Sequence, residues 1–540
     1  MNKIYVKFTY IPQTEKIHCE FEERYEYLAL NKWFARRREG FQFDPRFKLK
    51  LWDGYTRGFD RESDQIDLGL WKEAVKMCQE LGYPFQFTNK SEWPLNRDIK
   101  KSEAIEWMQE WIKGMGMSER DYQLRVASNI LKDRYCNASV ATSGGKTFIY
   151  SLFLFWCLTH GHKGKKFLLV VPSKTLVTQF YNDIIKYNAG RIDLNIQEIY
   201  GENPRITDPS REPDLVIATF QSLAGEKPVS KQDSKRPERT IKKIKKYPKE
   251  WFKQFWAVTG DEGHKQLSKS YQYIMKASKG YAYYRWGMSG SFPKEDSEEM
   301  MRIMQVTGPV CDQVKARELM DKGYITKVKI KGIIINWNDY EFAERLEIIA
   351  KQDKKVCYDL ECAKIQESEQ RIKIIKKIVT ESNHNVLVLF HNTEYGQKLY
   401  QELSKDQTRI YHYIDGSISN KKRAPILTDM EQTSPNRILI ASFGTLSTGV
   451  SIDSITGVIF TQSFKKEQII IQSIGRALRL HKDKALAYIF DLVDRFNINP
   501  DRAKKEGKWQ FKNVLFGHWV KRAKIYEDEE YPASTIEINL

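Results

Sequence analysis

Two sets of short apolar runs alternate with longer helical stretches from about residue 118, and this alternation constrains the fold more than any other feature. The first set comprises residues 137–142, 166–172, 214–220, 255–262 and 284–291, and the second comprises 385–392, 409–415, 437–443, 457–463 and 485–493. Strands that are apolar throughout are buried on both faces, as in parallel sheets covered by helices. The sequence therefore predicts an α/β protein with two doubly wound parallel-sheet domains in tandem.

The flanking segments have a different character. Residues 1–95 are rich in aromatic and charged residues with strand-like pieces, which indicates a small α+β accessory domain. A helical stretch at 96–117 joins it to the first parallel-sheet domain, which we expect over 118–325. The second such domain is expected over 326–500 and a C-terminal tail over 501–540. In the tail, residues 518, 522 and 526 share one helical face, which favours a helix packed on the second domain.

The charge of the chain favours a polyanionic partner. There are 88 Lys and Arg against 70 Asp and Glu, a net charge of +18. Nucleic acid fits this excess, although membranes and acidic proteins attract the same surface. An insertion at 225–250 holds ten Lys and Arg between residues 227 and 249. It is either a solvated loop or a contact to a nucleic-acid backbone.

Targeting and redox signals are absent from the sequence. None of the seven cysteines forms a Cys-x-x-Cys pair, which favours reduced thiols and the cytosol. The first residues lack the apolar core of a secretory signal. The most apolar segment, 148–158, is too short to cross a bilayer and reads as a buried helix.

A glycine-bearing loop follows the first apolar run of the first domain. Residues 141–147 read ATSGGKT, between a strand and a helix. Small residues let backbone amides approach phosphate oxygens, and the helix N-terminus adds partial positive charge. Lys146 then reaches the β- and γ-phosphates of ATP, and Thr147 ligates Mg²⁺. The expected nucleotide contacts in the loop are Thr142, Ser143, Gly144, Gly145, Lys146 and Thr147.

An acidic pair ends the fourth run of the same domain. Asp261 and Glu262 end this run, and we expect a carboxylate there to face the phosphate loop across adjacent strands. Phosphoryl transfer to water needs a metal that neutralises charge and a positioned base. We expect Asp261 to hold Mg²⁺ and Glu262 to accept the proton of the attacking water. Upstream, Gln123 is a candidate for reading the adenine edge.

Three donor-rich residues recur at helical spacing in the second domain. Gln472, Arg476 and Arg479 are spaced i, i+4 and i+7, so on a helix they share one face. The planar, permanently charged fork of arginine is suited to a γ-phosphate. We expect this face to stabilise the transition state and to couple hydrolysis to domain movement.

In this order the motifs resemble those of superfamily 2 helicases, whose two domains are RecA-like. They are ATSGGKT (141–147), VPSKTLVTQ (171–179), DEGH (261–264), SGS (289–291), VLVLFHN (386–392), SFGTLSTGVS (442–451) and QSIGRALR (472–479). The likeness narrows to the UvsW-type helicases of T-even bacteriophages through FDPRF and WDG near the N-terminus, YPKEWFKQF before DEGH, and the final EINL.

This resemblance implies an ATP-dependent 3′ to 5′ DNA helicase acting on branched or forked DNA and on R-loops in phage recombination, repair and replication. It implies the cytoplasm of an infected bacterial host, with recombination or single-strand-binding proteins as possible partners and no membrane.

The resemblance also implies which residues contact the DNA strand. The strand-backbone contacts carried over by position are Ser173, Lys174, Thr175, Thr219, Gln221, Asn392, Thr445, Thr448 and Gly449. Each is alternatively a capping or turn residue. His264, Ser289 and Ser291 would couple the ATP site to the strand.

Two motifs depart from the family pattern. Gly263 stands where many relatives carry Ala or Cys, and little effect is expected because a small residue is kept. Ser451 stands where many relatives carry Asp, which weakens the expectation of a salt bridge from that motif to Arg476.

The accessory domain is expected to bind DNA. Arg46 and Lys48 are candidates for gripping a duplex backbone, together with Lys50 and Arg57. Phe47 and Trp52 either approach the branch point or, as we favour, belong to the core of a small domain.

Three functions remain open from the sequence. The first is a branched-DNA helicase. The second is an ATP-driven translocase, or an RNA or R-loop remodelling enzyme, without general duplex unwinding. The third is an ATP-binding scaffold without turnover, against which intact Glu262, Arg476 and Arg479 argue.

Overall fold

The computed structural model describes most of the chain in two compact units. The described residues are 6–93, 99–201, 205–228, 243–245, 247–432, 434, 436–446, 452–463, 470–471, 473–475, 484, 486–506 and 513–540. Residues 1–140 and 145–313 form the first unit, and residues 314–540 form the second. The four loop residues Ala141–Gly144 are grouped with the second unit.

The N-terminal domain is a small mixed sheet with two helices. The sheet order is β5-β6-β2-β1-β7, formed by β1 (Val6–Ile11), β2 (Lys16–Phe21), β5 (Phe59–Asp60), β6 (Gln65–Asp67) and β7 (Phe85–Phe87). Helices α1 (Arg24–Trp33) and α3 (Trp71–Leu81), with the short 3₁₀ helix η2 (Leu68–Leu70), complete it. Alternate residues of β1 are buried, because only one face of its strand meets the core.

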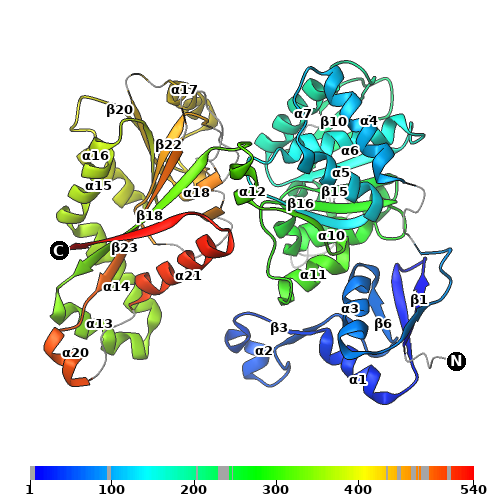
Figure 1. The fold of residues 1–540 in the computed structure, drawn as a ribbon, viewed down its shortest axis with the longest axis horizontal. Coiled ribbons are helices and arrows are strands. Elements are labelled where there is room, and N and C mark those ends of the chain that lie inside the picture. The colour runs from blue at the N-terminus through cyan, green and yellow to red at the C-terminus, as the bar shows by residue number, and fades with distance from the viewer. Residues whose placement is uncertain are drawn as a thin grey trace, which may run out of the picture. The chain divides into compact units, whose positions relative to one another are not determined.

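A separate finger leaves this domain between α1 and β5. It consists of β3 (Ala35–Arg37), η1 (Phe41–Phe43), α2 (Pro45–Lys48) and β4 (Tyr55–Arg57), with β3 and β4 antiparallel. Figure 1 shows β3 and α2 extending away from α3 and β6. Asp44 caps α2 by accepting a hydrogen bond from the Arg46 amide at 2.9 Å.

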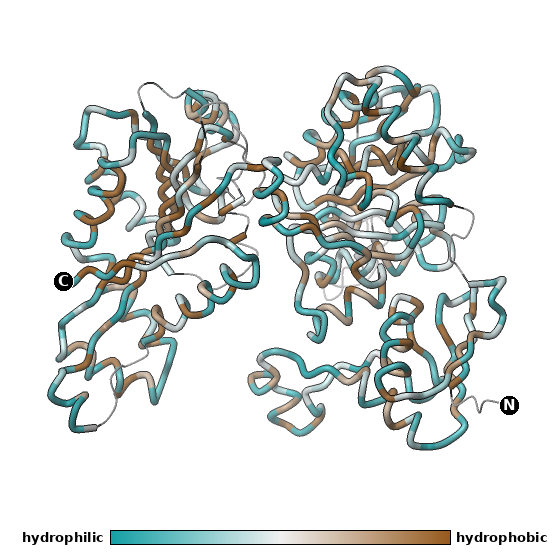
Figure 2. Tube along the Cα trace, in the orientation of Figure 1, coloured by the Kyte–Doolittle hydropathy of each residue, from teal (hydrophilic) through white to brown (hydrophobic). Residues whose placement is uncertain are grey.

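The first parallel-sheet domain carries the order β11-β10-β12-β9-β15-β16-β8-β17. Its strands are β8 (Tyr135–Val140), β9 (Lys166–Val171), β10 (Ile196–Ile199), β11 (Arg205–Ile206), β12 (Leu215–Thr219), β15 (Phe255–Gly260), β16 (Tyr284–Ser289) and β17 (Val310–Val314). The six consecutive strands from β10 to β8 are parallel. The central strands β12 and β16 are buried along their whole length, as expected for a sheet covered on both faces, and Figure 2 shows hydrophobic stretches within this sheet.

Helices cover this sheet in two groups. The first group is α4 (Lys101–Gly114), α5 (Asp121–Asp133), α6 (Lys146–Thr159) and α7 (Lys174–Asn188), which contact one another. The second is α8 (Phe220–Ala224), α9 (Lys249–Phe252), η4 (Gly263–Leu267), α10 (Lys269–Ala277) and α11 (Glu298–Thr307). Every residue from Phe148 to Leu158 of α6 is buried, which confirms the buried helix expected there. The expected joining helix appears as α4, which packs on α5 and α6.

The N-terminal domain is docked on α11 through apolar and charged contacts. Its core includes Met300, Met301, Ile303 and Met304 of that helix. At Gly69 a Cβ atom would lie 1.8 Å from the Met304 carbonyl oxygen, so only glycine permits this close approach. The accessory domain and the first parallel-sheet domain therefore share one core.

The second unit is built on a fully parallel sheet of order β20-β21-β19-β22-β23-β18-β24. Its strands are β18 (Lys327–Trp337), β19 (Asn385–Phe390), β20 (Ile410–Ile414), β21 (Arg437–Ser442), β22 (Ile455–Phe460), β23 (Leu486–Phe496) and β24 (Ala533–Asn539). Its helices are α12 (Ala316–Asp321), α13 (Tyr340–Gln352), α14 (Lys354–Glu367), α15 (Glu369–Glu381), α16 (Thr393–Leu403), α17 (Asn420–Met430), α18 (Phe443–Leu446), α20 (Pro500–Glu506) and α21 (Val514–Asp528).

The tail belongs to this second unit. Helix α21 packs on α14 and β23 and buries Trp519, Arg522 and Tyr526, as the spacing of its residues predicts. Strand β24 then extends the sheet beside β18. The predicted fold class of two tandem RecA-like sheets with a mixed-sheet accessory domain is confirmed.

The basic insertion is described only in part. Of the basic insertion, the structure describes its ends, where β13 (Glu226–Pro228) and β14 (Lys243–Lys245) pair antiparallel. The expected domain limits stay predictions, and the unit division at 313/314 falls before α12. Among the described residues, no helix is both long and apolar enough to cross a membrane.

Candidate nucleotide-binding and nucleic-acid-binding site

The phosphate loop joins β8 directly to the N-terminus of α6. Ser143 and Gly145 adopt left-handed backbone angles, with φ of 68° and 74°, which turn the chain sharply before the helix. The Lys146 Nζ donates to the Val140 carbonyl at 3.4 Å. The first turn of α6 leaves backbone amides without helical partners, and these suit an anion. Thr147 is half-buried in that turn.

Gln123 lies against this loop. A Cβ atom on Gly145 would lie 2.4 Å from the Gln123 Nε2, so the glycine makes room for the amide. The same Nε2 donates to the Tyr122 hydroxyl at 3.3 Å, and Arg120 donates to that hydroxyl at 3.5 Å. The structure thus brings the predicted base-reading residue beside the phosphate loop. Its contact with adenine stays a prediction.

The acidic pair follows β15, and β16 lies between this strand and β8, which precedes the phosphate loop. The expectation that the two strands are adjacent is therefore wrong, although both end at the same edge of the parallel sheet. Asp261 is buried, and among the described residues its Oδ1 has no hydrogen-bond partner. Burial, together with the Glu262 charge, raises the pKa of Asp261 to about 7, although Lys146 acts in the opposite direction. A buried carboxylate oxygen without a partner is costly unless a cation compensates it.

These donors fit a magnesium ion. Hard oxygen ligands, a carboxylate and a hydroxyl, are those that Mg²⁺ takes beside nucleotide phosphates. Asp261 after β15 would supply the carboxylate, and Thr147 at the start of α6 would supply the hydroxyl. Glu262 adopts a left-handed backbone with φ of 52°, a strained conformation for glutamate that is common at functional sites.

A chain of close polar contacts leads from the acidic pair to β16. His264 Nδ1 lies 3.4 Å from the Glu262 Oε2 and 2.9 Å from the Ser289 Oγ. The Ser291 amide donates to the same Ser289 oxygen at 3.4 Å. Burial lowers the pKa of His264, so the imidazole is neutral near pH 7. The three predicted coupling residues therefore form one network with Glu262.

Gly263 packs against the tip of the Phe292 ring, which would have to shift to admit a larger residue. A Cβ atom there would lie 2.7 Å from the Phe292 Cζ and 3.3 Å from the Met288 carbonyl oxygen. Phe292 follows directly after Ser291. The departure from the family pattern thus has a structural reason that the sequence did not reveal.

A hollow of about 630 Å³ opens at the carboxyl ends of β9 and β12. Its lining residues are Pro172, Ser173, Lys174, Tyr200, Gly201, Arg205, Thr219, Gln221 and Ser222. Four predicted nucleic-acid contacts therefore gather in one place, whereas Thr175 is exposed and does not line it.

Two of these residues also cap helices. Ser173 accepts from the Leu176 amide at 3.4 Å, and Thr219 accepts from the Ser222 amide at 3.4 Å. Capping does not compete with lining the hollow, because each hydroxyl has further lone-pair capacity. Tyr200 and Arg205 were missed by sequence reasoning. Tyr200 lines the hollow, and its ring centre lies 4.8 Å from the Lys174 ammonium.

In the second unit, Asn392 and Thr445 follow β19 and β21. Asn392 caps α16 by accepting from the Tyr395 amide at 2.9 Å. Thr445 is buried, with its hydroxyl 2.7 Å from that of Ser442. Gln462 was not predicted, yet its Oε1 accepts from the Asn392 amide at 3.0 Å. The remaining predicted residues of this unit lie outside the described residues, namely Gln472, Arg476, Arg479, Thr448, Gly449 and Ser451.

The finger of the N-terminal domain exposes both cations and apolar side chains. Arg46 and Lys48 are exposed, as expected. Phe47 and Trp52 are half-buried within the finger rather than in the main core: the Phe47 ring packs 4.7 Å from that of Phe41. The exposed apolar residues are Phe43, Leu49 and Leu51, at 73%, 68% and 75%.

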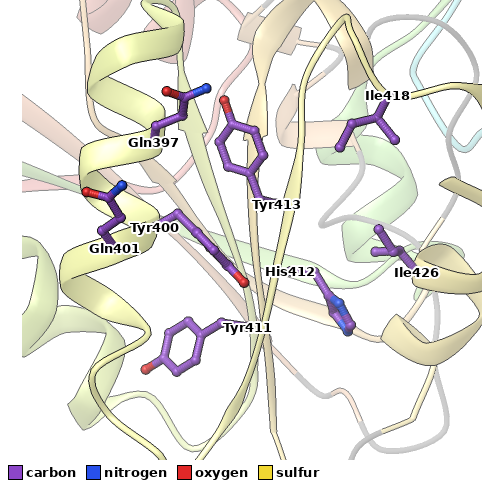
Figure 3. A pocket seen from close by; sticks show the side chains of 8 residues that line it. All are labelled: Gln397, Tyr400, Gln401, Tyr411, His412, Tyr413, Ile418 and Ile426. Atoms are coloured by element: carbon purple, nitrogen blue, oxygen red, sulfur yellow. The ribbon is translucent and has the colours of Figure 1, made fainter. Parts of the chain in front are cut away.

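A second hollow, of about 440 Å³, follows the free edge of β20 in the second unit. Figure 3 shows Gln397, Tyr400 and Gln401 of α16 on one side of the strand and Ile426 of α17 on the other. Among the described residues that line it, none is a predicted site residue.

The fold and this arrangement of lysine, carboxylates and histidine define a superfamily 2 helicase. Three family models match in chain order. The DNA helicase UvsW N-terminal model matches residues 4–88, the type III restriction enzyme res subunit model 116–294, and the helicase conserved C-terminal model 370–481. The chain is a UvsW-like member of this superfamily.

One curated relative and two solved structures are similar to this chain. The ATP-dependent DNA helicase uvsW of Enterobacteria phage T4 is 26% identical over 535 residues, covering 97% of each chain. The crystal structure of T4 UvsW covers 99% of this chain and 100% of that chain at 23% identity, with a TM-score of 0.45. The DNA-bound type ISP restriction-modification enzyme LlaBIII covers 86% of this chain and 36% of that chain, at 15% identity and a TM-score of 0.53, and so shares the fold.

Proposed function

We propose that this chain hydrolyses ATP with Mg²⁺ and uses the energy to move on and unwind DNA, with branched or forked DNA as its substrate. The observation that carries the proposal is the convergence of Lys146, Asp261, Glu262 and His264 at the carboxyl ends of parallel strands. The T4 relative is named an ATP-dependent DNA helicase, which supports DNA as the substrate.

The residues divide the chemistry among themselves. Lys146 binds the phosphates, and Asp261 and Thr147 hold Mg²⁺, which neutralises charge on the transferring phosphoryl group. Glu262 accepts a proton from the attacking water. The neutral His264 contacts both Glu262 and Ser289 of β16. A movement of the Glu262 carboxylate is therefore transmitted to β16, and a movement of β16 is transmitted to Glu262. Gln472, Arg476 and Arg479 complete the site in this proposal, on the strength of their sequence spacing.

The nucleic-acid strand is proposed to lie across the hollow formed by Ser173, Lys174, Thr219 and Gln221. Hydroxyls, amides and an ammonium bind phosphates without reading bases. The finger adds Arg46 and Lys48 for a duplex backbone. Its exposed Phe43 can stack on a base at a junction, and the exposed Leu49 and Leu51 can make apolar contacts beside it. Polarity from 3′ to 5′, action in an infected host cell, and association with recombination or single-strand-binding proteins belong to the same proposal.

The test begins with hydrolysis. Phosphate release should rise when DNA is added, and Glu262→Gln should lower turnover by at least about 100-fold while ATP and DNA binding persist. Lys146→Ala is the matched control, because it should lose ATP binding as well. Near-normal turnover by Glu262→Gln would remove Glu262 from its role.

The substrate is tested separately. Strand displacement should be compared for four-way junctions, forks, plain tailed duplexes and RNA–DNA hybrids under one salt condition. Preference for junctions and forks supports the proposal. Translocation along DNA without displacement of any strand, or action on RNA alone, would instead favour the alternative translocase or remodelling enzyme.

A further inference from the structure

A polar hollow of about 380 Å³ lies where the finger of the N-terminal domain meets α11. The finger lines it with Arg38, Arg46, Trp52 and Thr56, and α11 lines it with Glu298, Arg302 and Gln305. The three residues of α11 are spaced i, i+4 and i+7, so they form one stripe along that helix. This hollow belongs to the first unit and shares no lining residue with the hollow at the carboxyl ends of β9 and β12.

Positive charge dominates the lining. Arg38, Arg46 and Arg302 contribute three guanidinium groups, and Glu298 contributes the one carboxylate among the lining residues. Glu298 is 6% exposed, accepts from the Thr56 hydroxyl at 2.9 Å and lies 3.7 Å from Arg302. Its charge is therefore compensated within the wall. A concave surface with an excess of positive charge suits an anionic ligand.

Two of these guanidinium groups have donor capacity left for a ligand. Among the described residues, the polar contacts of the Arg302 guanidinium are the Leu267 carbonyl at 3.4 Å and Glu298 at 3.7 Å. The Arg38 guanidinium has one such contact, with Asp44 at 3.5 Å. These distances are longer than those of good N–H···O hydrogen bonds. Because each guanidinium carries five N–H groups in a planar fork, a phosphate can accept from both.

Arg46 and Trp52 add flat surfaces to the same hollow. The Arg46 guanidinium lies 5.0 Å from the centre of the Trp52 ring and donates to Asp44 at 2.9 Å. The Trp52 indole donates to the Tyr55 carbonyl at 2.8 Å, which fixes the ring. Planar aromatic and guanidinium groups beside phosphate-binding cations are typical of surfaces on which the bases of single strands stack.

The size of the hollow decides between a duplex and a single strand. A volume of about 380 Å³ is near the lower end of the range for sites that take one small molecule. Such a hollow admits a group of about one nucleotide but not the paired width of a duplex. A strand with unpaired bases can place one phosphate and its base there.

Helix α11 also connects this hollow to the proposed motor. The helix begins at Glu298, shortly after the SGS motif, whose Ser289 contacts His264. A strand in the hollow would therefore touch the element that directly follows the coupling residues.

We propose that this hollow, here called the second-strand site, binds a phosphate and base of the second single-stranded arm of a forked DNA. The hollow at the carboxyl ends of β9 and β12 holds the first arm. This inference rests on the proposed function, because it assumes that forked or branched DNA is the substrate. A fork occupies both hollows, whereas a duplex with one arm occupies only the first.

The test compares two DNAs without nucleotide: a fork with two single-stranded arms, and the same duplex with the 3′ arm alone. Arg302→Gln and Arg38→Gln should each lower the affinity for the fork by about five-fold or more. Each should also reduce the slope of log affinity against log salt by about 0.7, the value for one phosphate of a single strand. The affinity for the one-armed duplex should not change. Arg46 stays unsubstituted because it is also proposed to contact the duplex backbone.

The matched control is Arg211→Gln. The Arg211 side chain is 37% exposed, against 36% for Arg302, so the substitution removes the same charge at the same exposure. Arg211 pairs with Asp193 at 2.8 Å and precedes the amino end of β12, the end opposite Thr219. Its loss should change neither affinity. Thermal melts that match wild type establish that a loss of affinity in any variant does not come from unfolding.

A second measurement locates the arm directly. A photoreactive thymine analogue is placed in the second arm of the fork, and the cross-linked peptides are identified by mass spectrometry. We expect cross-links to the peptides that contain Trp52 or Arg302. The same label in the 3′ arm should instead mark the peptide that contains Tyr200, which lines the other hollow.

The outcomes separate this inference from the proposed function. Equal losses of affinity for the fork and the one-armed duplex, or fork binding by both variants equal to that of Arg211→Gln, would overturn the second-strand site. Cross-links from the second arm to other peptides would do the same. Should wild type bind the fork no more tightly than the one-armed duplex, the proposed preference for branched DNA fails, and the inference fails with it.

Discussion

Replacing Glu15 by Gln tests how the accessory domain is held on the first parallel-sheet domain. Glu15 lies in the turn between β1 and β2, with a left-handed backbone at φ 50°. Its Oε1 accepts from Arg285 Nη1 at 3.2 Å and from the Gly280 amide at 2.6 Å, and its Oε2 pairs with Arg285 Nη2. The side chains of Glu15 and Arg285 are 2% and 3% exposed.

The magnitude follows from this burial. Glutamine keeps the shape but leaves the Arg285 charge without its paired carboxylate in a site closed to water. Breaking a buried pair in this way costs about 3–5 kcal/mol, which is about two to nearly four orders of magnitude in an equilibrium constant. The exposed pair of Lys7 and Glu20, at 49% and 52%, is worth about 0–1 kcal/mol, so Glu20→Gln is the matched control.

The assay is hydrogen–deuterium exchange of the peptide containing the Gly280 amide, which reports the local opening free energy. A local measure is preferred because a chain of several domains need not unfold in two states. We expect faster exchange in Glu15→Gln and unchanged exchange in Glu20→Gln. Equal protection in both variants, within about 1 kcal/mol, would refute the argument from burial.

The same pair predicts a pH dependence. Burial disfavours the charged form of Glu15, but Arg285 and the Gly280 amide outweigh it and hold its pKa below the ordinary 4.5. A carboxyl with a lowered pKa stabilises the fold fully above its unfolded pKa, and that stability is lost as the pH falls through the folded pKa. Wild type should therefore lose Gly280 protection below about pH 4.5, and Glu15→Gln should lack this acid transition.

Two further predictions concern the motor. Gly263→Ala should lower DNA-stimulated turnover by about ten-fold, because the new methyl displaces Phe292 or the DEGH segment. Adding Phe292→Ala should restore most of the lost turnover. Additive losses in the double variant would contradict this steric account. Lys174→Ala should weaken DNA binding for all sequences and reduce the slope of log affinity against log salt by about one; an unchanged slope would remove this ammonium from the DNA surface.

Much of the site could be read from local sequence. The loop at 141–147 and the acidic pair at Asp261 and Glu262 each follow an apolar strand, and parallel strands bring their carboxyl ends to one edge of a sheet. The buried helix at 148–158 follows from its unbroken apolar composition. Local spacing also predicted the face of α21 that carries Arg522 and Tyr526.

Long-range contacts were not readable in this way. Tyr200 and Arg205 join the hollow after β9 because β10 and β11 fold beside it, which no local pattern encodes. The same holds for Phe292 against Gly263, and for the half-buried positions of Phe47 and Trp52 within the finger.

The sequence by itself determined the two parallel-sheet domains, the order of the motifs and the residue types proposed for catalysis, because strand and helix periodicities and loop chemistry act over a few residues. Only the tertiary structure decided that Glu15 pairs with Arg285 and that Thr56 of the finger contacts Glu298 of α11. The partners in these contacts are brought together by packing of distant elements. Buried charge and shape complementarity select them, and these depend on the whole fold rather than on spacing along the chain.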